Sequence, residues 1–206
     1  ANIFRKLPEE DIETFAKEHF PEHYRKDRTV FFWNNRNARR KLSGSVLWWF
    51  NEFAKEVGPE NVQLIMHTDP KDVHGQDLEH IIHALGAEDG RIILSTQKLP
   101  PEILSMLYNL ADCTVNISDA EGFGLATLES LSCETPIVVN LTGGLQEQVT
   151  DGEDWFGIGI EPSSKAVIGS QSVPYIYEDR VSKEDFIQAL RTMHAMPKEE
   201  RKKLGK

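Results

Sequence analysis

The chain has 206 residues, 39% of them hydrophobic, and 33 acidic against 23 basic side chains give it a formal net charge of -10. This composition is that of a folded protein and excludes a disordered chain. The acidic balance opposes binding to nucleic acid, because affinity for a polyanion depends on Lys and Arg. The longest apolar stretch, residues 46–50, is far shorter than the roughly 20 residues that span a bilayer, so we expect no transmembrane segment.

Short apolar runs rich in β-branched residues alternate with segments of helical periodicity, a pattern typical of a parallel sheet covered by helices. A charged helix is expected first, over residues 8–18. The expected strands are residues 29–33, 62–67, 91–95, 113–118, 136–140 and 156–160. The other expected helices are residues 43–57, 78–85, 101–110, 125–133, 145–149 and 183–193. We therefore predict an α/β fold, with a Rossmann-like parallel sheet of about six strands flanked by helices on both faces.

Residues 1–28 are interpreted as a linker and lead-in helix, and residues 29–206 as one domain. Ser43 is expected to cap its helix, and Gly58 to end it. Residues 161–180 are expected to form a long loop that contains a candidate strand at 173–177. The basic run 198–206 is expected to be a solvated helix terminus. Cys113 and Cys133 lie in apolar segments and are expected to be buried reduced thiols, which favours a cytoplasmic location.

A glycine-rich turn follows the fourth expected strand and leads into a helix. It runs over residues 118–125 and contains Glu121, Gly122 and Gly124, and Glu129 follows eight positions after Glu121. Ligands of open α/β sheets bind beyond the carboxyl ends of the strands, where a turn into a helix presents backbone N–H groups to an anion. Carboxylates beside a phosphate make sense if they face hydroxyl donors, such as those of a sugar and a ribose. The alternative is a tight turn that serves packing alone.

Cationic side chains follow the first expected strand, at the same edge of the predicted sheet. They are Arg36, Arg39, Arg40 and Lys41. Two loops at this edge would converge on one small anionic ligand; the alternative is a positively charged surface loop. A second glycine turn, Gly143-Gly144, follows the fifth strand and adds Glu147.

These motifs together resemble glycosyltransferase family 4, whose members are retaining enzymes of the GT-B architecture. The resemblance rests on residues 121–125 with Leu128 and Glu129, on Cys133 and residues 135–138, and on Gly143, Gly144 and Glu147. Residues 107–112 resemble the helix before the signature strand, and residues 3–7 resemble the linker into the C-terminal domain. Glu134 departs from the pattern, because the family usually has glycine there.

The resemblance implies the role of a domain that binds a nucleotide-sugar donor. Glu121 would contact the sugar, Glu129 the ribose hydroxyls, and Arg36 with Lys41 the diphosphate; Arg39 and Arg40 compete with Arg36. Other donor-binding candidates are Gly122, Phe123, Gly124, Leu125, Arg40, Thr96, Gly143 and Gly144. Glu121, Arg36 and Lys41 are the catalytic candidates, since cations stabilise the departing nucleoside diphosphate. The donor, linked to UDP, GDP or ADP, is a co-substrate, and no cofactor or metal is expected.

The family pairs this domain with an N-terminal acceptor domain. We therefore expect the 206 residues to be the donor-binding half of a longer hexosyltransferase, with any peripheral membrane contact made through the absent half. A non-catalytic nucleotide or nucleotide-sugar binding module and a sugar-nucleotide epimerase of GT-B architecture are the alternatives. A nicotinamide dehydrogenase is disfavoured, because no Gly-x-Gly-x-x-Gly turn follows the first strand. His67, His74, His80 and His83 lack the ligand spacing of a zinc site.

Overall fold

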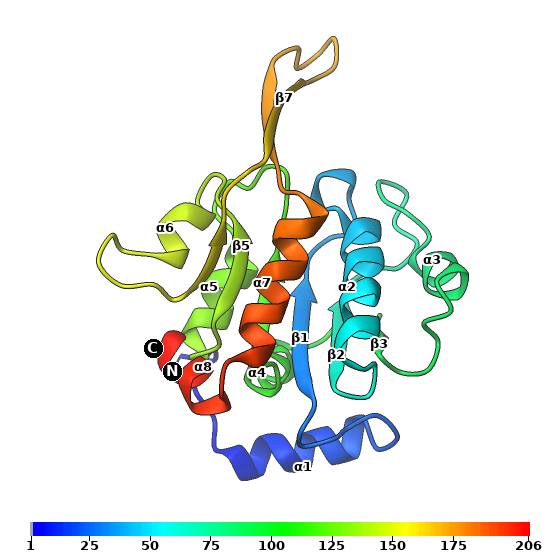
Figure 1. Ribbon diagram of the computed structural model, residues 1–206, viewed down its shortest axis with the longest axis vertical. Helices are drawn as coiled ribbons and strands as arrows, with labels where there is room; N and C mark the ends of the chain where they lie inside the picture. Colours follow the sequence, from blue (N-terminus) through cyan, green and yellow to red (C-terminus); the bar gives the residue numbers. More distant parts are fainter. Residues whose placement is uncertain (1) are drawn as a thin grey trace.

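A computed structural model describes residues 2–206 and has a six-stranded parallel sheet at its centre (Figure 1). The strands are β1 (Thr29–Asn34), β2 (Val62–His67), β3 (Ile92–Ser95), β4 (Cys113–Asn116), β5 (Ile137–Asn140) and β6 (Gly157–Ile160). The helices are α1 (Glu9–His19), α2 (Ser43–Val57), α3 (Leu78–Ala84), α4 (Pro101–Leu110), α5 (Leu125–Ser132), α6 (Leu145–Val149), α7 (Lys183–Ala195) and α8 (Lys198–Leu204), with a 3-10 helix η1 (Arg39–Lys41). The predicted α/β class and the parallel sheet of six strands are confirmed.

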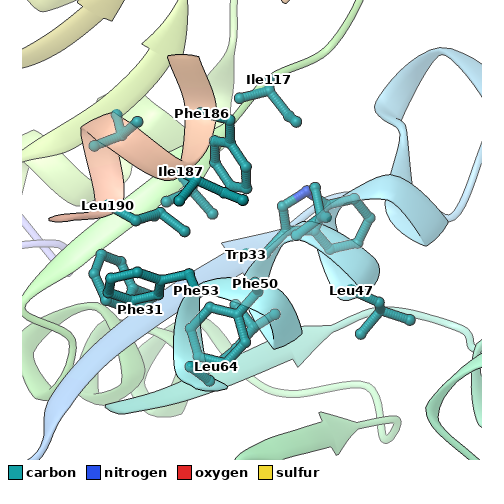
Figure 2. Packing of buried hydrophobic residues seen from close by; sticks show 14 of the residues in the cluster. Phe31, Trp33, Leu47, Phe50, Phe53, Leu64, Ile117, Phe186, Ile187 and Leu190 are labelled. Carbon is teal, nitrogen blue, oxygen red and sulfur yellow. The ribbon is translucent and has the colours of Figure 1, made fainter. Parts of the chain in front are cut away.

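Strand β1 lies between two apolar layers because successive side chains of a strand point to opposite faces of the sheet. Phe31 and Trp33 pack with α2, α3 and α7, in the layer that Figure 2 shows. Val30 and Phe32 pack with α1 and α4 on the other face. Each of these side chains is at most 6% exposed, and burying one contributes about 1.5–3 kcal/mol. Helices therefore cover both faces of the sheet, as predicted.

All six strands are parallel, and their order in the sheet is β3-β2-β1-β4-β5-β6. The side of the sheet on which the chain adds strands changes between β1 and β4, which we call the reversal point. From β1 the chain builds outward through β2 and β3, and it then returns to place β4, β5 and β6 on the other side. At such a reversal the loops after the two neighbouring strands diverge and leave a crevice, which is where open α/β sheets bind their ligands. The cationic loop follows β1 and the glycine-rich turn follows β4, so the two predicted motifs flank the reversal point.

The segment 161–180 is a β-hairpin, and the prediction of a long loop was wrong. Strand β7 (Ser164–Ile168) pairs antiparallel with β8 (Ile176–Arg180), and the pair projects beyond the edge of the sheet that carries the ends of β1 and β4 (Figure 1). The candidate strand at 173–177 corresponds to β8 but was placed three residues too early. Val167 and Tyr177 face each other across the hairpin and are each about half exposed, so the usual alternation of buried and exposed residues is weak.

Two local predictions also need correction. Ser43 is the first residue of α2 and not its cap: Leu42 holds the capping position at φ 56°, and the Ser43 hydroxyl donates to Asn37 Oδ1 at 2.6 Å. The run 198–206 is not wholly solvated, because Arg201 in α8 is only 9% exposed and donates to Thr29 Oγ1 at 3.2 Å. Within residues 2–206, no helix has the length and apolar character needed to cross a membrane.

Candidate functional site

The carboxylate of Glu121 is the point where both sides of the reversal meet. Lys41, the last residue of η1, brings its ammonium group into contact with Glu121 Oε2. Arg40 Nη1 lies 3.7 Å from Glu121 Oε1 and donates to the carbonyl of Ala120 at 2.6 Å. Asn116, at the end of β4, donates to Glu121 Oε2 at 3.3 Å. The structure thus brings together the catalytic candidates Lys41 and Glu121 and the donor-binding candidate Arg40.

The pair is nearly withdrawn from water, with Lys41 only 7% exposed. Burial opposes ionisation of Glu121, but the neighbouring Lys41, Asn116 and Arg40 together hold the pKa of its carboxyl below the usual value. Burial likewise lowers the pKa of Lys41, an effect that its contact with Glu121 opposes. Each charge therefore depends on the other, and an anion that approached Lys41 would compete with Glu121 for it.

The glycine turn between Glu121 and α5 contains two glycines in different surroundings. At Gly122 a Cβ atom would meet nothing within 4 Å, so the fold itself does not require glycine there. Gly124 has φ +84°, and a Cβ on it would lie 2.7 Å from Leu145 Cδ2. In the part of the chain that the structure describes, no side chain caps α5 at Gly124, so the N–H groups of its first turn are open to an external acceptor. Phe123 and Leu125 flank the turn and are exposed.

The second glycine pair, Gly143-Gly144, supports this turn from behind. A Cβ on Gly143 would lie 1.7 Å from the carbonyl oxygen of Glu121, and the Gly144 amide donates to the Gly122 carbonyl at 3.0 Å. Gln148 of α6 donates to the carbonyls of Phe123 and Gly124. The close backbone approach explains why residues 143 and 144 are both glycine, and it assigns them a packing role. Their predicted contact with a donor stays a prediction.

Glu129 lies in α5, where its carboxylate is held by a buried tyrosine of α4. The Tyr108 hydroxyl donates to Glu129 Oε2 at 2.8 Å and accepts from Asn34 Nδ2 at 2.8 Å. Burial raises the pKa of Glu129, and the hydrogen bond from Tyr108 opposes that shift. Asn34 is the last residue of β1, so this chain of hydrogen bonds begins at the same edge of the sheet as η1.

Arg36 and Thr96 lie apart from the convergence at Glu121. The Arg36 guanidinium pairs with Asp72 Oδ2 at 2.7 Å and contacts His74 Nδ1 at 2.7 Å, in the loop between β2 and α3. Arg36 also holds the pKa of Asp72 far below its usual range. Thr96 follows β3, two strands away from β1, and is exposed. The catalytic role of Arg36 stays a prediction that would require it to leave Asp72.

Strand β8 of the hairpin contacts the loops that surround the site. Arg39 forms a two-point contact with Glu178 of β8, at 2.5 and 3.2 Å. The Asp179 amide donates to the Asp119 carbonyl at 2.8 Å, and its carboxylate accepts from Thr142 Oγ1 at 2.9 Å. Strand β8 therefore connects the loops that follow β1, β4 and β5.

Asp119 stands out because its carboxylate is buried without a hydrogen bond. It is 1% exposed, and within residues 2–206 neither of its side-chain oxygens has a hydrogen-bond partner. Arg180 Nε, 3.7 Å away, is its nearest cation. Burial raises the pKa of Asp119 to about 6, and the neighbouring Glu178 adds to the shift, while the charges of Arg180 and Arg39 oppose it.

Sequence reasoning missed the residues that orient the site: Asn34, Tyr108, Asn116, Gln148 and Glu178. Of these, Tyr108 falls in the segment 107–112 that resembled the family, which was a usable signal. Asn34, Gln148 and Glu178 gave no signal, since their contacts join segments that only the tertiary fold brings together. Asn116 contacts Glu121 only five positions further on, and nothing in its surroundings in the sequence marked it out. Within residues 2–206, no group of three or more His, Cys, Asp or Glu side chains is arranged to hold a metal ion.

Solved structures of similar fold include the C-terminal domain of a group 1 glycosyl transferase. Sucrose-phosphate synthase from Thermosynechococcus elongatus matches with a TM-score of 0.73 at 20% identity, over 99% of this chain and 43% of the other. Anabaena HepE, solved in complex with UDP and glucose, matches with a TM-score of 0.72 at 17% identity, over 99% and 47%. The C-terminal domain of the Francisella tularensis group 1 glycosyl transferase LpcC matches with a TM-score of 0.69 at 17% identity, over 99% of this chain and 91% of the other. The fold is therefore that of the C-terminal domain of a GT-B glycosyltransferase.

Sequence similarity identifies the family. The profile described as Glycosyl transferases group 1 matches residues 54–204, and the chain belongs to this family. Among curated relatives, the D-inositol 3-phosphate glycosyltransferase of Acidothermus cellulolyticus is 41% identical over 69 residues, 34% of this chain and 15% of the relative. That of Paenarthrobacter aurescens is 33% identical over 113 residues, 53% of this chain and 26% of the relative. The chain thus covers about a quarter or less of the length of these relatives.

Proposed function

We propose that the chain is the donor-binding domain of a retaining glycosyltransferase, which transfers a hexosyl group from a nucleoside-diphosphate sugar to an acceptor. The observation that carries this proposal is the convergence of Lys41 and Arg40 on Glu121 at the reversal point of the sheet, opposite the open glycine turn. Cations, free helix N–H groups and carboxylates at one edge of the sheet suit a diphosphate flanked by two sugars.

The chemistry follows from charge development. When the bond between the anomeric carbon and the diphosphate oxygen breaks, negative charge moves onto the diphosphate. Lys41, Arg40 and the first N–H groups of α5 would stabilise that charge, without a metal ion. Arg36 would join them on release from Asp72. Glu121 would accept hydrogen bonds from the sugar hydroxyls, and Glu129 from the ribose.

The proposal includes a second, acceptor-binding domain and a cytoplasmic location. The short coverage of the relatives supports the additional domain, and the complex of HepE with UDP and glucose supports a nucleotide sugar as donor. Cys113 and Cys133 are both buried and free, which suits a reducing compartment.

Calorimetric titration with UDP, GDP and ADP tests donor binding directly. We expect one of the three to bind, and both Lys41→Ala and Glu129→Ala to weaken that binding at least tenfold, as loss of a charged contact does. Lys55→Ala, which changes an exposed lysine near the end of α2, is the control and should bind as the wild type does. If the wild type binds none of the three nucleotides, the proposal is refuted.

A further inference from the structure

The hydroxyl of Tyr108 lies between Asn34 and Glu129 in a chain of two hydrogen bonds. Asn34 Nδ2 and Glu129 Oε2 each lie 2.8 Å from the Tyr108 oxygen. The three residues come from β1, α4 and α5, so the chain spans from the centre of the sheet to the helix that follows the glycine turn. None of these contacts is needed to form the secondary structure of the elements themselves.

The direction of the hydrogen bonds is fixed by the chemistry of the groups. The Asn34 amide nitrogen only donates, so the Tyr108 oxygen accepts from it and must direct its single proton elsewhere. The carboxylate of Glu129 is the acceptor within reach. Burial raises the pKa of Tyr108, which keeps its proton in place. The proton of Tyr108 is therefore committed to Glu129 Oε2.

The tyrosine ring cannot easily move. Tyr108 is fully buried, and its ring makes edge contacts with Phe32 at 5.0 Å and Phe4 at 5.9 Å between ring centres. The aromatic packing fixes the position of the hydroxyl, which in turn fixes one oxygen of Glu129. Within residues 2–206, Glu129 Oε1 has no hydrogen-bond partner, so it is left to accept from a ligand.

We infer that Tyr108 is a positioning residue that holds Glu129 ready to accept hydrogen bonds from the ribose hydroxyls of the donor nucleotide. The inference rests on the proposed function, in which Glu129 faces the ribose. A carboxylate that is already oriented loses less conformational freedom on binding than a mobile one, and its remaining oxygen points in one direction. Tyr108 thus makes the site selective for ribonucleotides over nucleotides that lack the ribose hydroxyls.

The test compares UDP, GDP or ADP, whichever binds, with the 2′,3′-dideoxy form of the same nucleotide. We expect the wild type to bind the ribonucleotide at least tenfold more tightly than the dideoxy form, as loss of hydrogen bonds to a charged group predicts. In Tyr108→Phe, affinity for the ribonucleotide should fall about tenfold, whereas affinity for the dideoxy form should change little. The double variant Tyr108→Phe, Glu129→Ala should be no weaker than Glu129→Ala.

Two further variants make the result specific. Asn34→Asp replaces the donor by a second acceptor for the Tyr108 proton, and it should reduce ribose selectivity in the same way. Tyr24→Phe removes a hydroxyl from a half-buried tyrosine that precedes β1, and it should leave selectivity unchanged. A wild type that binds no nucleotide would refute the proposed function, and this inference with it. Binding by the wild type with equal loss for both nucleotide forms in Tyr108→Phe would overturn the inference alone.

Discussion

Lys41 and Glu121 form a buried ion pair although 80 positions separate them in the chain. They meet because β1 and β4 are neighbouring parallel strands, whose carboxyl ends lie at the same edge of the sheet. Lys41 ends the short 3-10 helix after β1, and Glu121 lies in the turn after β4. The ion pair therefore joins the loops on the two sides of the reversal point and places opposite charges where the proposed donor would lie.

Replacing Lys41 by methionine should destabilise the protein in a pH-dependent way. The folded pKa of Glu121 lies below its unfolded value, so the pair contributes stability at neutral pH that is lost as pH falls through the folded pKa. In Lys41→Met, a nearly buried carboxylate loses its counter-ion while Arg40 and Asn116 remain, at a cost of about 3 kcal/mol at pH 7. Urea unfolding should show a smaller difference from the wild type at pH 4. A difference that is equal at both pH values would contradict this account.

The two glycines of the turn should respond differently to alanine. Gly122→Ala should leave stability within about 0.5 kcal/mol of the wild type, because its Cβ meets no atom within 4 Å. The same methyl group should weaken nucleotide binding if the diphosphate lies against this backbone. Gly124→Ala should cost more than 1 kcal/mol, because φ is +84° and Leu145 lies in the way. Thermal unfolding and calorimetry on the pair separate the two roles, and unchanged nucleotide affinity in Gly122→Ala would count against a diphosphate at this position.

The arrangement of the sheet could be predicted because it follows from local patterns. Continuous apolar runs such as β1 require burial on both faces, and the alternation with helices requires parallel strands. Since all strands of such a sheet end at one edge, the meeting of the loops after β1 and β4 follows from the topology. The hairpin could not be predicted in this way, because β7 and β8 are largely exposed and lack a regular apolar period.

The choice among the basic side chains could not be predicted either. Arg36, Arg39, Arg40 and Lys41 lie within six positions, yet they have different partners in the structure. Arg36 pairs with Asp72 and Arg39 with Glu178, so only the last two reach Glu121. The partners of the first two come from distant segments, whose positions depend on the packing of the complete chain.

Removal of Glu178 should loosen the hairpin and the loops that it holds. Glu178 is only 3% exposed and pairs with Arg39, whose hydrogen bond lowers the pKa of its carboxyl. In Glu178→Ala, Arg39 and Arg180 would lose this carboxylate, at a cost of about 1–2 kcal/mol. Hydrogen exchange should become faster in β7 and β8. Glu161→Ala, at an exposed position before β7, serves as the control, and equal exchange in both variants would argue against this role of Glu178.

Asp119→Asn should stabilise the protein above pH 6. Burial raises the pKa of Asp119 from 3.8 to about 6, so the folded state favours the protonated form. Stability from this group is present below its unfolded pKa and is lost as pH rises through about 6. Asparagine removes the buried charge and should add about 1 kcal/mol at pH 8, allowing for the lost attraction to Arg180, and almost nothing at pH 4. Urea unfolding at pH 4 and pH 8 measures the two gains. A gain of the same size at both pH values would show that protonation of Asp119 does not affect the stability of the protein.

Glu134→Gly should also stabilise the fold, for a reason that lies in the backbone. Glu134 follows the last turn of α5 with φ +57°, the left-handed position where helices usually end in glycine. This conformation costs an L-residue about 1–2 kcal/mol, and the greater freedom of glycine in the unfolded chain offsets about 0.5–1 kcal/mol of the relief. A net gain of about 0.5–1 kcal/mol in denaturant unfolding is expected. Glu134→Ala, which removes the carboxylate but keeps the Cβ, should give no such gain, and a similar gain in both variants would assign the effect to the charge of Glu134 instead.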